Sequence, residues 1–209
     1  EGAGLPVEKT VTPFSVTWDY RCPFARNAHE HIVAGLADGA DWDITFLPFS
    51  LTQSHVPEGG TPVWDDPSKF ADLIALAAGV VVRDQYPEQF GVAHEALFAA
   101  RHDQGLDLRK SEVVAGVLDR SGLPGDKILA EVENGSPIAD IRRSHEQAVS
   151  EWEVFGVPTF VMNGRAVFVR LMSRPQGDAA LARRTIDNVI RLLDEHPELN
   201  EFKYTTLSQ

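Results

Sequence analysis

The chain of 209 residues is 43% hydrophobic and 24% charged, and it carries a formal net charge of −12. This composition is typical of a globular protein and excludes a disordered or fibrous chain. The negative charge disfavours nucleic acid as a partner, because phosphate backbones are themselves anionic. No run of about 18 apolar residues is present, so no membrane-spanning helix is expected.

Cys22 is the only cysteine in the chain. One cysteine forms no internal disulfide, which agrees with a reducing compartment. The first residues, 1–11, lack the basic segment and apolar run of a signal peptide. We therefore expect a cytoplasmic protein.

The first predicted unit runs from residue 14 to residue 49. Apolar and polar side chains alternate over residues 14–18, which predicts a strand that ends near Asp19. Apolar residues then recur at helical spacing up to Gly39, and Pro23 suits the first position of this helix, so Cys22 is predicted as its N-cap. A second strand is predicted over residues 42–49. It is expected to be parallel to the first, because a crossover helix joins the two.

A helical insertion is predicted to follow. Residues 50–66 are rich in Pro, Gly, Ser and Thr, which is typical of a loop. The segments beyond this loop are rich in Ala, Leu, Glu and Val and are bounded by glycine and proline, as helices are. Helices are predicted over residues 67–83, 87–104, 111–120, 124–133 and 137–153.

The last part of the chain returns to strands. Asn163-Gly164 separates strand-like runs at residues 158–162 and 165–169, which predicts an antiparallel hairpin with a type I′ turn. An amphipathic helix is predicted over residues 177–195, ended by Pro197. The chain is thus predicted to be an α/β protein with the order β-α-β, insertion, β-β-α. One domain would combine residues 1–65 and 153–209, and the insertion would span 66–152.

The strongest candidate for chemistry is Cys22. A sulfur at a helix start lies near unpaired N–H groups and the positive end of the helix dipole, which favour the thiolate. The residues therefore predict an acidified, nucleophilic thiol. A lone cysteine is more often a small buried hydrophobe. The position of Cys22 before Pro23, at the carboxyl end of a predicted parallel strand, favours the functional role.

These features resemble the DsbA-like family of the thioredoxin superfamily. The resemblance rests on Cys22-Pro23-Phe24-Ala25 after the first strand, the helical insertion, and residues 156–159 (Gly-Val-Pro-Thr) before the third strand. The motifs at residues 173–178, 196–199 and 201–203 are similar to those of actinobacterial mycothiol-dependent reductases. The resemblance implies a thioredoxin-like fold, a cis Val157–Pro158 bond facing the cysteine, and a Val157 backbone that pairs with a substrate strand. From the residues alone, the cis and trans forms both stay open.

The chain departs from the family at two places. Ala25 occupies the position of the second cysteine of dithiol members, so no internal disulfide can release a bound partner. Whether Ala25 is natural or a replacement of that cysteine stays open. We expect a monothiol cycle, in which an external low-molecular-weight thiol, mycothiol or glutathione, acts as cosubstrate and no cofactor is bound tightly. The second departure, at residues 168–172, affects the region of the expected thiol pocket.

Other candidate residues give weaker signals. Trp18 and Phe24 flank the thiol and are candidates for an apolar rim that binds substrate or cosubstrate, although aromatic residues at such positions more often belong to the core. His29 lies two turns beyond Cys22, and a solvated helix histidine is the favoured interpretation over a thiol partner. No histidine, cysteine or acidic cluster has the spacing of a metal site, so none is predicted.

Three functions compete. The leading hypothesis is a DsbA-like monothiol oxidoreductase that uses the Cys22 thiolate on an unknown disulfide or electrophile. The second is a thiol-cofactor-dependent isomerase or kappa-type glutathione transferase, which activates a bound thiol without covalent attachment; that branch typically carries Ser in place of Cys22. The third is a redox-inactive thioredoxin-like binding or chaperone module, which Ala25 favours. A homodimer is left open.

Overall fold

The computed structural model describes residues 11–206, in which four strands form one sheet with the order β2-β1-β3-β4. The strands are β1 (Thr12–Trp18), β2 (Trp42–Pro48), β3 (Thr159–Met162) and β4 (Arg165–Phe168). β1 and β2 are parallel, and β3 is antiparallel to both β1 and β4. The antiparallel pairing sets the end of β1 beside the start of β3. The loops after Trp18 and before Thr159 therefore meet at one edge of the sheet.

The β3–β4 hairpin confirms the turn predicted from Asn163-Gly164. Met162 pairs with Arg165, and the two central residues have φ values of 52° and 73°. Both values are positive, as a two-residue type I′ turn requires, and asparagine and glycine tolerate them best. The hairpin therefore follows from local sequence chemistry.

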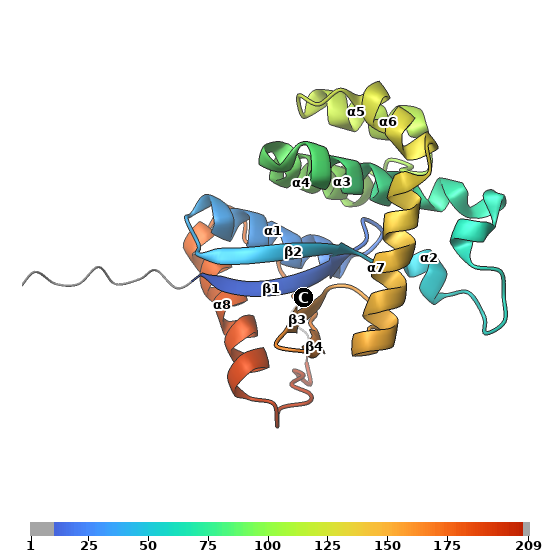
Figure 1. Cartoon of the computed structure of the whole chain (residues 1–209). Coiled ribbons are helices and arrows are strands. Elements are labelled where there is room, and N and C mark those ends of the chain that lie inside the picture. The colour runs from blue at the N-terminus through green and yellow to red at the C-terminus, as the bar shows by residue number, and fades with distance from the viewer. Residues whose placement is uncertain (1–10, 207–209) are drawn as a thin grey trace, which may run out of the picture.

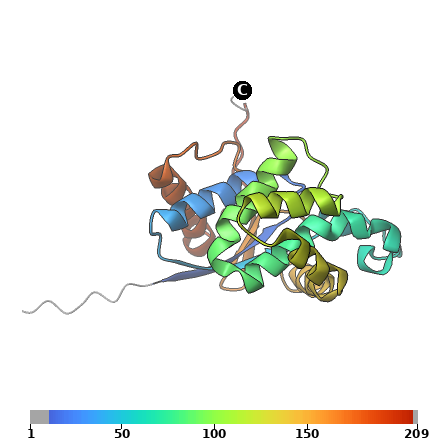
Figure 2. The ribbon, with the colours of Figure 1, turned by 90° about the horizontal axis from the view of Figure 1, so that it is seen from above.

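Helices α1 (Pro23–Ala37) and α8 (Ala179–Glu195) pack against each other beside the sheet (Figure 1). In the view from above, α1 lies between α8 and the green helices of the insertion (Figure 2). One apolar cluster joins α1 and α8 to the strands. Its buried members are Phe14, Val16, Ala28, Ile32, Trp42, Phe160, Ile186, Ile190 and Leu193.

The helical insertion is present, with boundaries that differ from the predicted ones. Its elements are the 3₁₀ helices η2 (Pro67–Leu73) and η3 (Pro87–Gln89) and the α-helices α3 (Ile74–Gln85), α4 (Phe90–His102), α5 (Ser111–Arg120), α6 (Gly125–Glu133) and α7 (Ser136–Trp152). The first and second predicted helices thus begin as 3₁₀ turns, which are frequent at helix termini and connections. The prediction of a plain loop over residues 50–66 is wrong. This segment contains helix α2 (Leu51–Ser54), which the Ser50 hydroxyl caps, and the 3₁₀ helix η1 (Val63–Asp65).

The insertion and the sheet share apolar packing. Trp18, Cys22, Phe49 and Val157 belong to the same buried cluster as residues from α3 to α7. The division into a domain of residues 1–65 and 153–209 and a second domain of 66–152 stays a prediction. The N-terminal expectation about residues 1–11 falls outside the described residues, apart from Val11.

Within residues 11–206, no helix has the length and apolar character needed to cross a membrane.

Candidate active site

Cys22 is the N-cap of α1, as the sequence predicts. Its backbone is extended, with φ −96° and ψ 120°, and Pro23 takes the first helical position. The Sγ atom accepts a hydrogen bond from the Ala25 backbone N–H at 3.4 Å. This contact satisfies one of the N–H groups that a helix start leaves unpaired.

The thiol faces the loop before β3. Cys22 Sγ donates to the Val157 carbonyl oxygen at 3.3 Å, and the Val157–Pro158 peptide bond is cis. A thiol has a proton to donate to a carbonyl oxygen, whereas a thiolate has none. This hydrogen bond therefore requires the protonated form of Cys22.

The prediction of an acidified thiol is wrong. Cys22 is only 9% exposed, and burial raises the pKa of its thiol above the ordinary value. The Ala25 and Phe24 backbone N–H groups act in the opposite direction but do not outweigh the loss of solvation. The charge of Asp19 raises the thiol pKa further, and the charge of Arg170, whose effect is smaller, lowers it. The helix-start argument considered the local dipole and omitted burial, which the sequence does not display.

Asp19 organises the loop that carries Cys22, and sequence reasoning missed it. Its carboxylate is 4% exposed and accepts hydrogen bonds from the Arg21 N–H at 2.9 Å and the Leu51 N–H at 2.8 Å. Burial raises the pKa of this carboxyl group despite both bonds. The only sequence signal was an acidic residue directly after a buried strand. The carboxylate ties the loop after β1 to the start of α2.

Two buried threonines fix the opposing loop. The Thr159 N–H donates to Thr17 Oγ1 at 2.8 Å, and the Thr159 hydroxyl donates to the Gly156 carbonyl at 2.8 Å. Val157 is therefore held by side chains from both β1 and β3, and its carbonyl is aimed at Cys22 by the fold.

The two aromatic residues predicted for the apolar rim lie in different surroundings. Trp18 is fully buried in the core, so its assignment to a substrate-binding rim is wrong. Phe24 is half-buried, and the Arg170 guanidinium carbon lies 5.2 Å from its ring centroid. Sequence reasoning missed Arg170 and also Phe155, which is 71% exposed and packs on Phe168 with ring centroids 5.1 Å apart. Pro23 is exposed, whereas Ala25 is completely buried.

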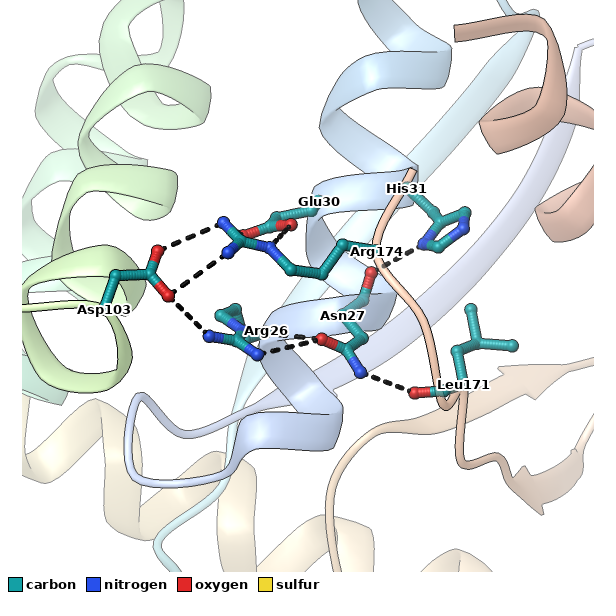
Figure 3. A network of polar contacts seen from close by, with 7 residues as sticks. All are labelled: Arg26, Asn27, Glu30, His31, Asp103, Leu171 and Arg174. Atoms are coloured by element: carbon teal, nitrogen blue, oxygen red, sulfur yellow. Dashed lines mark hydrogen bonds and ion pairs between the residues drawn. The ribbon is translucent and has the colours of Figure 1, made fainter. Parts of the chain in front are cut away.

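An ionic network holds the segment between β4 and α8 against α1 (Figure 3). Arg174 forms a bidentate pair with Glu30, with both N–O distances at 2.7 Å, and also reaches Asp103 at 3.1 and 3.2 Å. Arg26 pairs with Asp103 at 2.8 Å. Asn27 donates to the Leu171 carbonyl at 2.8 Å. The network links α1, the end of α4 and residues 171–174.

Glu30→Gln is expected to lower the free energy of unfolding by about 1 to 2 kcal/mol, because it removes the best-buried acid of the network while Asp103 stays. Urea unfolding would measure it, and limited proteolysis should show faster cleavage near Arg174. The matched control is Glu146→Gln, which breaks an exposed pair with Arg142 and should cost less than about 0.5 kcal/mol. Equal effects of the two changes would contradict a structural role of the network.

His29 is not solvated, which corrects the sequence interpretation. It is completely buried and belongs to a hydrogen-bonded chain between α1 and α4. Its Nε2–H donates to the Thr17 carbonyl at 3.0 Å, so its Nδ1 accepts from His94 Nε2–H at 2.9 Å. His94 Nδ1 then accepts from the Tyr20 hydroxyl at 2.8 Å. Gly79 leaves room for that hydroxyl, because a Cβ there would lie 2.6 Å from it.

Both histidines of this hydrogen-bonded series, His29 and His94, are neutral. Burial lowers the pKa of His29 to about 4, and burial together with the neighbouring His29 lowers the pKa of His94 well below its ordinary value. The acceptor nitrogen of each histidine already accepts a hydrogen bond. A further proton on that nitrogen would place two N–H or O–H donors opposite each other with no acceptor between them. Over the part of the chain that the structure describes, no group of three or more His, Cys, Asp or Glu residues is placed to hold a metal ion.

A parallel β-α-β unit, an antiparallel hairpin and a cysteine N-cap facing a cis-proline loop define a thiol protein with the thioredoxin fold. The chain belongs to the DSBA-like thioredoxin domain family, whose model matches residues 15–173. The chain is therefore a DsbA-like thiol oxidoreductase by class.

Three solved structures illustrate the likeness. DsbA from Pseudomonas aeruginosa is 20% identical, with 89% of this chain and 88% of that chain covered and a TM-score of 0.56. The cytosolic disulfide reductase DsbM from the same organism, solved with GSH, is 13% identical over 86% of this chain and 100% of that chain, with a TM-score of 0.58. A 2-hydroxychromene-2-carboxylate isomerase is 15% identical over 86% and 97%, with the same TM-score. These identities support a shared fold. No curated protein sequence matches the chain.

Proposed function

We propose that this chain is a monothiol oxidoreductase in which Cys22 is the nucleophile and a small external thiol completes the cycle. One observation carries the proposal. Cys22 Sγ lies between the helix N–H of Ala25 and the Val157 carbonyl, while the fully buried Ala25 occupies the position of the second thiol. The site thus has an attacking sulfur and lacks an internal sulfur that could displace its adduct.

The proposed cycle has two exchange steps. The Cys22 thiolate attacks one sulfur of a substrate disulfide, the substrate S–S bond breaks, and the other half leaves as a thiolate that takes a proton from water. A small thiolate then attacks the adduct at the sulfur distal to Cys22, and Cys22 leaves as a thiolate. In sum, one external thiol is consumed, one half of the substrate is released as a thiol, and the other half leaves as a mixed disulfide with the external thiol, so electrons balance and Cys22 is regenerated.

Ionisation of Cys22 is the demanding step. The raised pKa keeps most of the thiol protonated at neutral pH, and the proton is held toward Val157. A bound substrate strand that pairs with the Val157 backbone would compete for this carbonyl and free the sulfur. The rate of reaction at Cys22 should therefore increase as the pH rises above the ordinary thiol pKa of about 8.5.

Mycothiol and glutathione are the proposed resolving thiols, with no tightly bound cofactor. The GSH in the solved DsbM structure supports a small thiol as partner, and the description of DsbM as cytosolic supports a cytoplasmic location. The substrate is proposed to be a disulfide or electrophile. A homodimer stays a prediction.

To test the monothiol cycle, the reduced protein is incubated with glutathione disulfide and with mycothiol disulfide between about pH 6 and pH 10. The mass of the protein is then measured by mass spectrometry. We expect one adduct per chain, formed faster as the pH rises, and released by the matching thiol. Cys22→Ser is the control and should form none. Absence of an adduct on the unmodified chain at every pH would refute the monothiol cycle.

A second candidate function is favoured by the protonated state of the thiol. A Cys22 S–H that donates to Val157 is equally able to donate to the thiolate of a bound cofactor thiol, as the isomerase or kappa-type transferase hypothesis requires. In that case Cys22→Ser would keep a donor and retain activity. The monothiol mechanism predicts complete loss of thiol transfer in the same variant, so this single change separates the two candidates.

A further inference from the structure

Arg170 is an exposed cation at the first turn of α1, the helix that Cys22 caps. It follows β4, its side chain is exposed, and its guanidinium lies over the Phe24 ring at 5.2 Å. Among residues 11–206 it forms no ion pair and no hydrogen bond, whereas its neighbours Arg26 and Arg174 are both bound to acids. A guanidinium that is held in place without a carboxylate partner is available to an anion from solution.

The fold holds Arg170 in this place from both sides. The Val169 N–H donates to the Pro158 carbonyl at 3.1 Å, and the Leu171 carbonyl accepts from Asn27 at 2.8 Å. Figure 3 shows the second anchor, where Leu171 and Arg174 lie against α1. Residue 170 therefore lies between two fixed neighbours.

The aromatic platform of Arg170 belongs to the first turn of α1. Phe24 is two residues after Cys22, and the positive charge of Arg170 has a small lowering effect on the pKa of the thiol. An arginine stacked on an aromatic face keeps the N–H groups at its edge free, and these match the two oxygens of a carboxylate. Phe24 thus orients the guanidinium and leaves its hydrogen-bonding edge open.

We propose that Arg170 binds a carboxylate of the small disulfide or thiol that reacts at Cys22, with Phe24 as the platform that orients the guanidinium. This inference rests on the proposed function and narrows its cosubstrate. Glutathione carries carboxylates and mycothiol carries none, so the assignment favours a glutathione-type thiol. Arg170 acts as a specificity-determining residue and takes no part in bond making.

The overall charge of the protein disfavours an anionic cosubstrate unless a cation lies near the site. A net charge of −12 repels anions from the protein as a whole. At an ionic strength of about 0.15 M the Debye length is about 8 Å, so distant acids are screened while a cation at the first turn of α1 still acts. Attraction of a carboxylate by Arg170 can therefore oppose the repulsion from the net negative charge of the protein.

The test compares two alkylating reagents on the whole protein. Iodoacetate carries a carboxylate and iodoacetamide is neutral, and both consume the same thiolate, so the ratio of their rate constants cancels any change in the Cys22 pKa. At about 0.15 M salt, Arg170→Gln should lower the iodoacetate-to-iodoacetamide ratio about three- to fivefold, the size of an exposed charge pair. Arg170→Lys should give an intermediate ratio, because it keeps the charge and loses the planar fork.

The matched control is Arg184→Gln, which removes the same charge from α8 and should leave the ratio unchanged. An unchanged ratio in Arg170→Gln, or equal falls in both variants, would overturn the proposal. Adduct formation with glutathione disulfide and with neutral hydroxyethyl disulfide forms a second arm, in which only the glutathione reaction should slow in Arg170→Gln. If no disulfide forms an adduct, the proposed function fails, and the alkylation ratio still decides on carboxylate recognition.

Discussion

Ala25→Cys is expected to form an internal disulfide with Cys22 and to create insulin-disulfide reductase activity at least about tenfold above the unchanged chain. The Ala25 backbone nitrogen is 3.4 Å from Cys22 Sγ, and a side chain three residues after the N-cap lies on the same first turn of α1. A sulfur at this position can attack an adduct on Cys22 without waiting for an external thiol. It can also donate a hydrogen bond to the Cys22 thiolate, which lowers its pKa.

Mass measurement of the oxidised variant would show the disulfide as a loss of two hydrogens, and insulin precipitation would report the activity. Ala28→Cys is the matched control, since Ala28 is equally buried on α1 but lies a further turn from Cys22. It should form neither the disulfide nor the activity. A variant with cysteine at position 25 that stays reduced and inactive under oxidant would favour the redox-inactive binding module instead.

Mild acid is expected to destabilise the folded chain through its buried histidines. His29, His94 and His145 are buried, and burial lowers the pKa of His29 and His145 to about 4 and that of His94 also well below 6.5. Between pH 6.5 and about 4 these groups are neutral in the fold and protonated in the unfolded chain. The unfolded state then binds more protons, so the free energy of unfolding falls as the pH falls, by about 2 kcal/mol per histidine from pH 7.5 to pH 5.

His94→Leu isolates this effect from that of other groups such as Asp19. At pH 7.5 the variant should be about 3 kcal/mol less stable, because the Tyr20 hydroxyl and His29 lose their partner. At pH 5 the difference in the free energy of unfolding between the variant and the unchanged chain should be about 2 kcal/mol smaller, since the variant has one buried histidine fewer to oppose folding. Urea unfolding followed by tryptophan fluorescence would measure both values.

The control for the acid experiment is His55→Leu. His55 is exposed, and its bond to the Leu51 carbonyl lies at the surface. The free energy of unfolding of this variant should differ little from that of the unchanged chain. A His94→Leu gap that does not change with pH would contradict a neutral buried histidine in the folded state.

Short-range sequence features determined much of the fold. The alternation of apolar and polar residues predicted β1, Pro23 predicted the start of α1, and Asn163-Gly164 predicted the hairpin. Each of these features depends on the backbone preferences of a few adjacent residues. The same reasoning placed Cys22 at the N-cap correctly. Boundaries were less accurate where proline began a segment, since the choice between a 3₁₀ turn and an α-helix at Pro67 and Pro87 depends on surrounding packing.

The chemistry of the site was decided by contacts between distant parts of the chain. The sequence by itself determined that a single thiol begins a helix without a resolving partner. Only the tertiary structure decided that this thiol is buried and has a raised pKa, that Trp18 belongs to the core, and that His29 is bonded to His94, 65 residues away. Desolvation and charge depend on what the fold packs around a group, and Arg170 reaches Phe24 and Cys22 only because β4 and α1 meet.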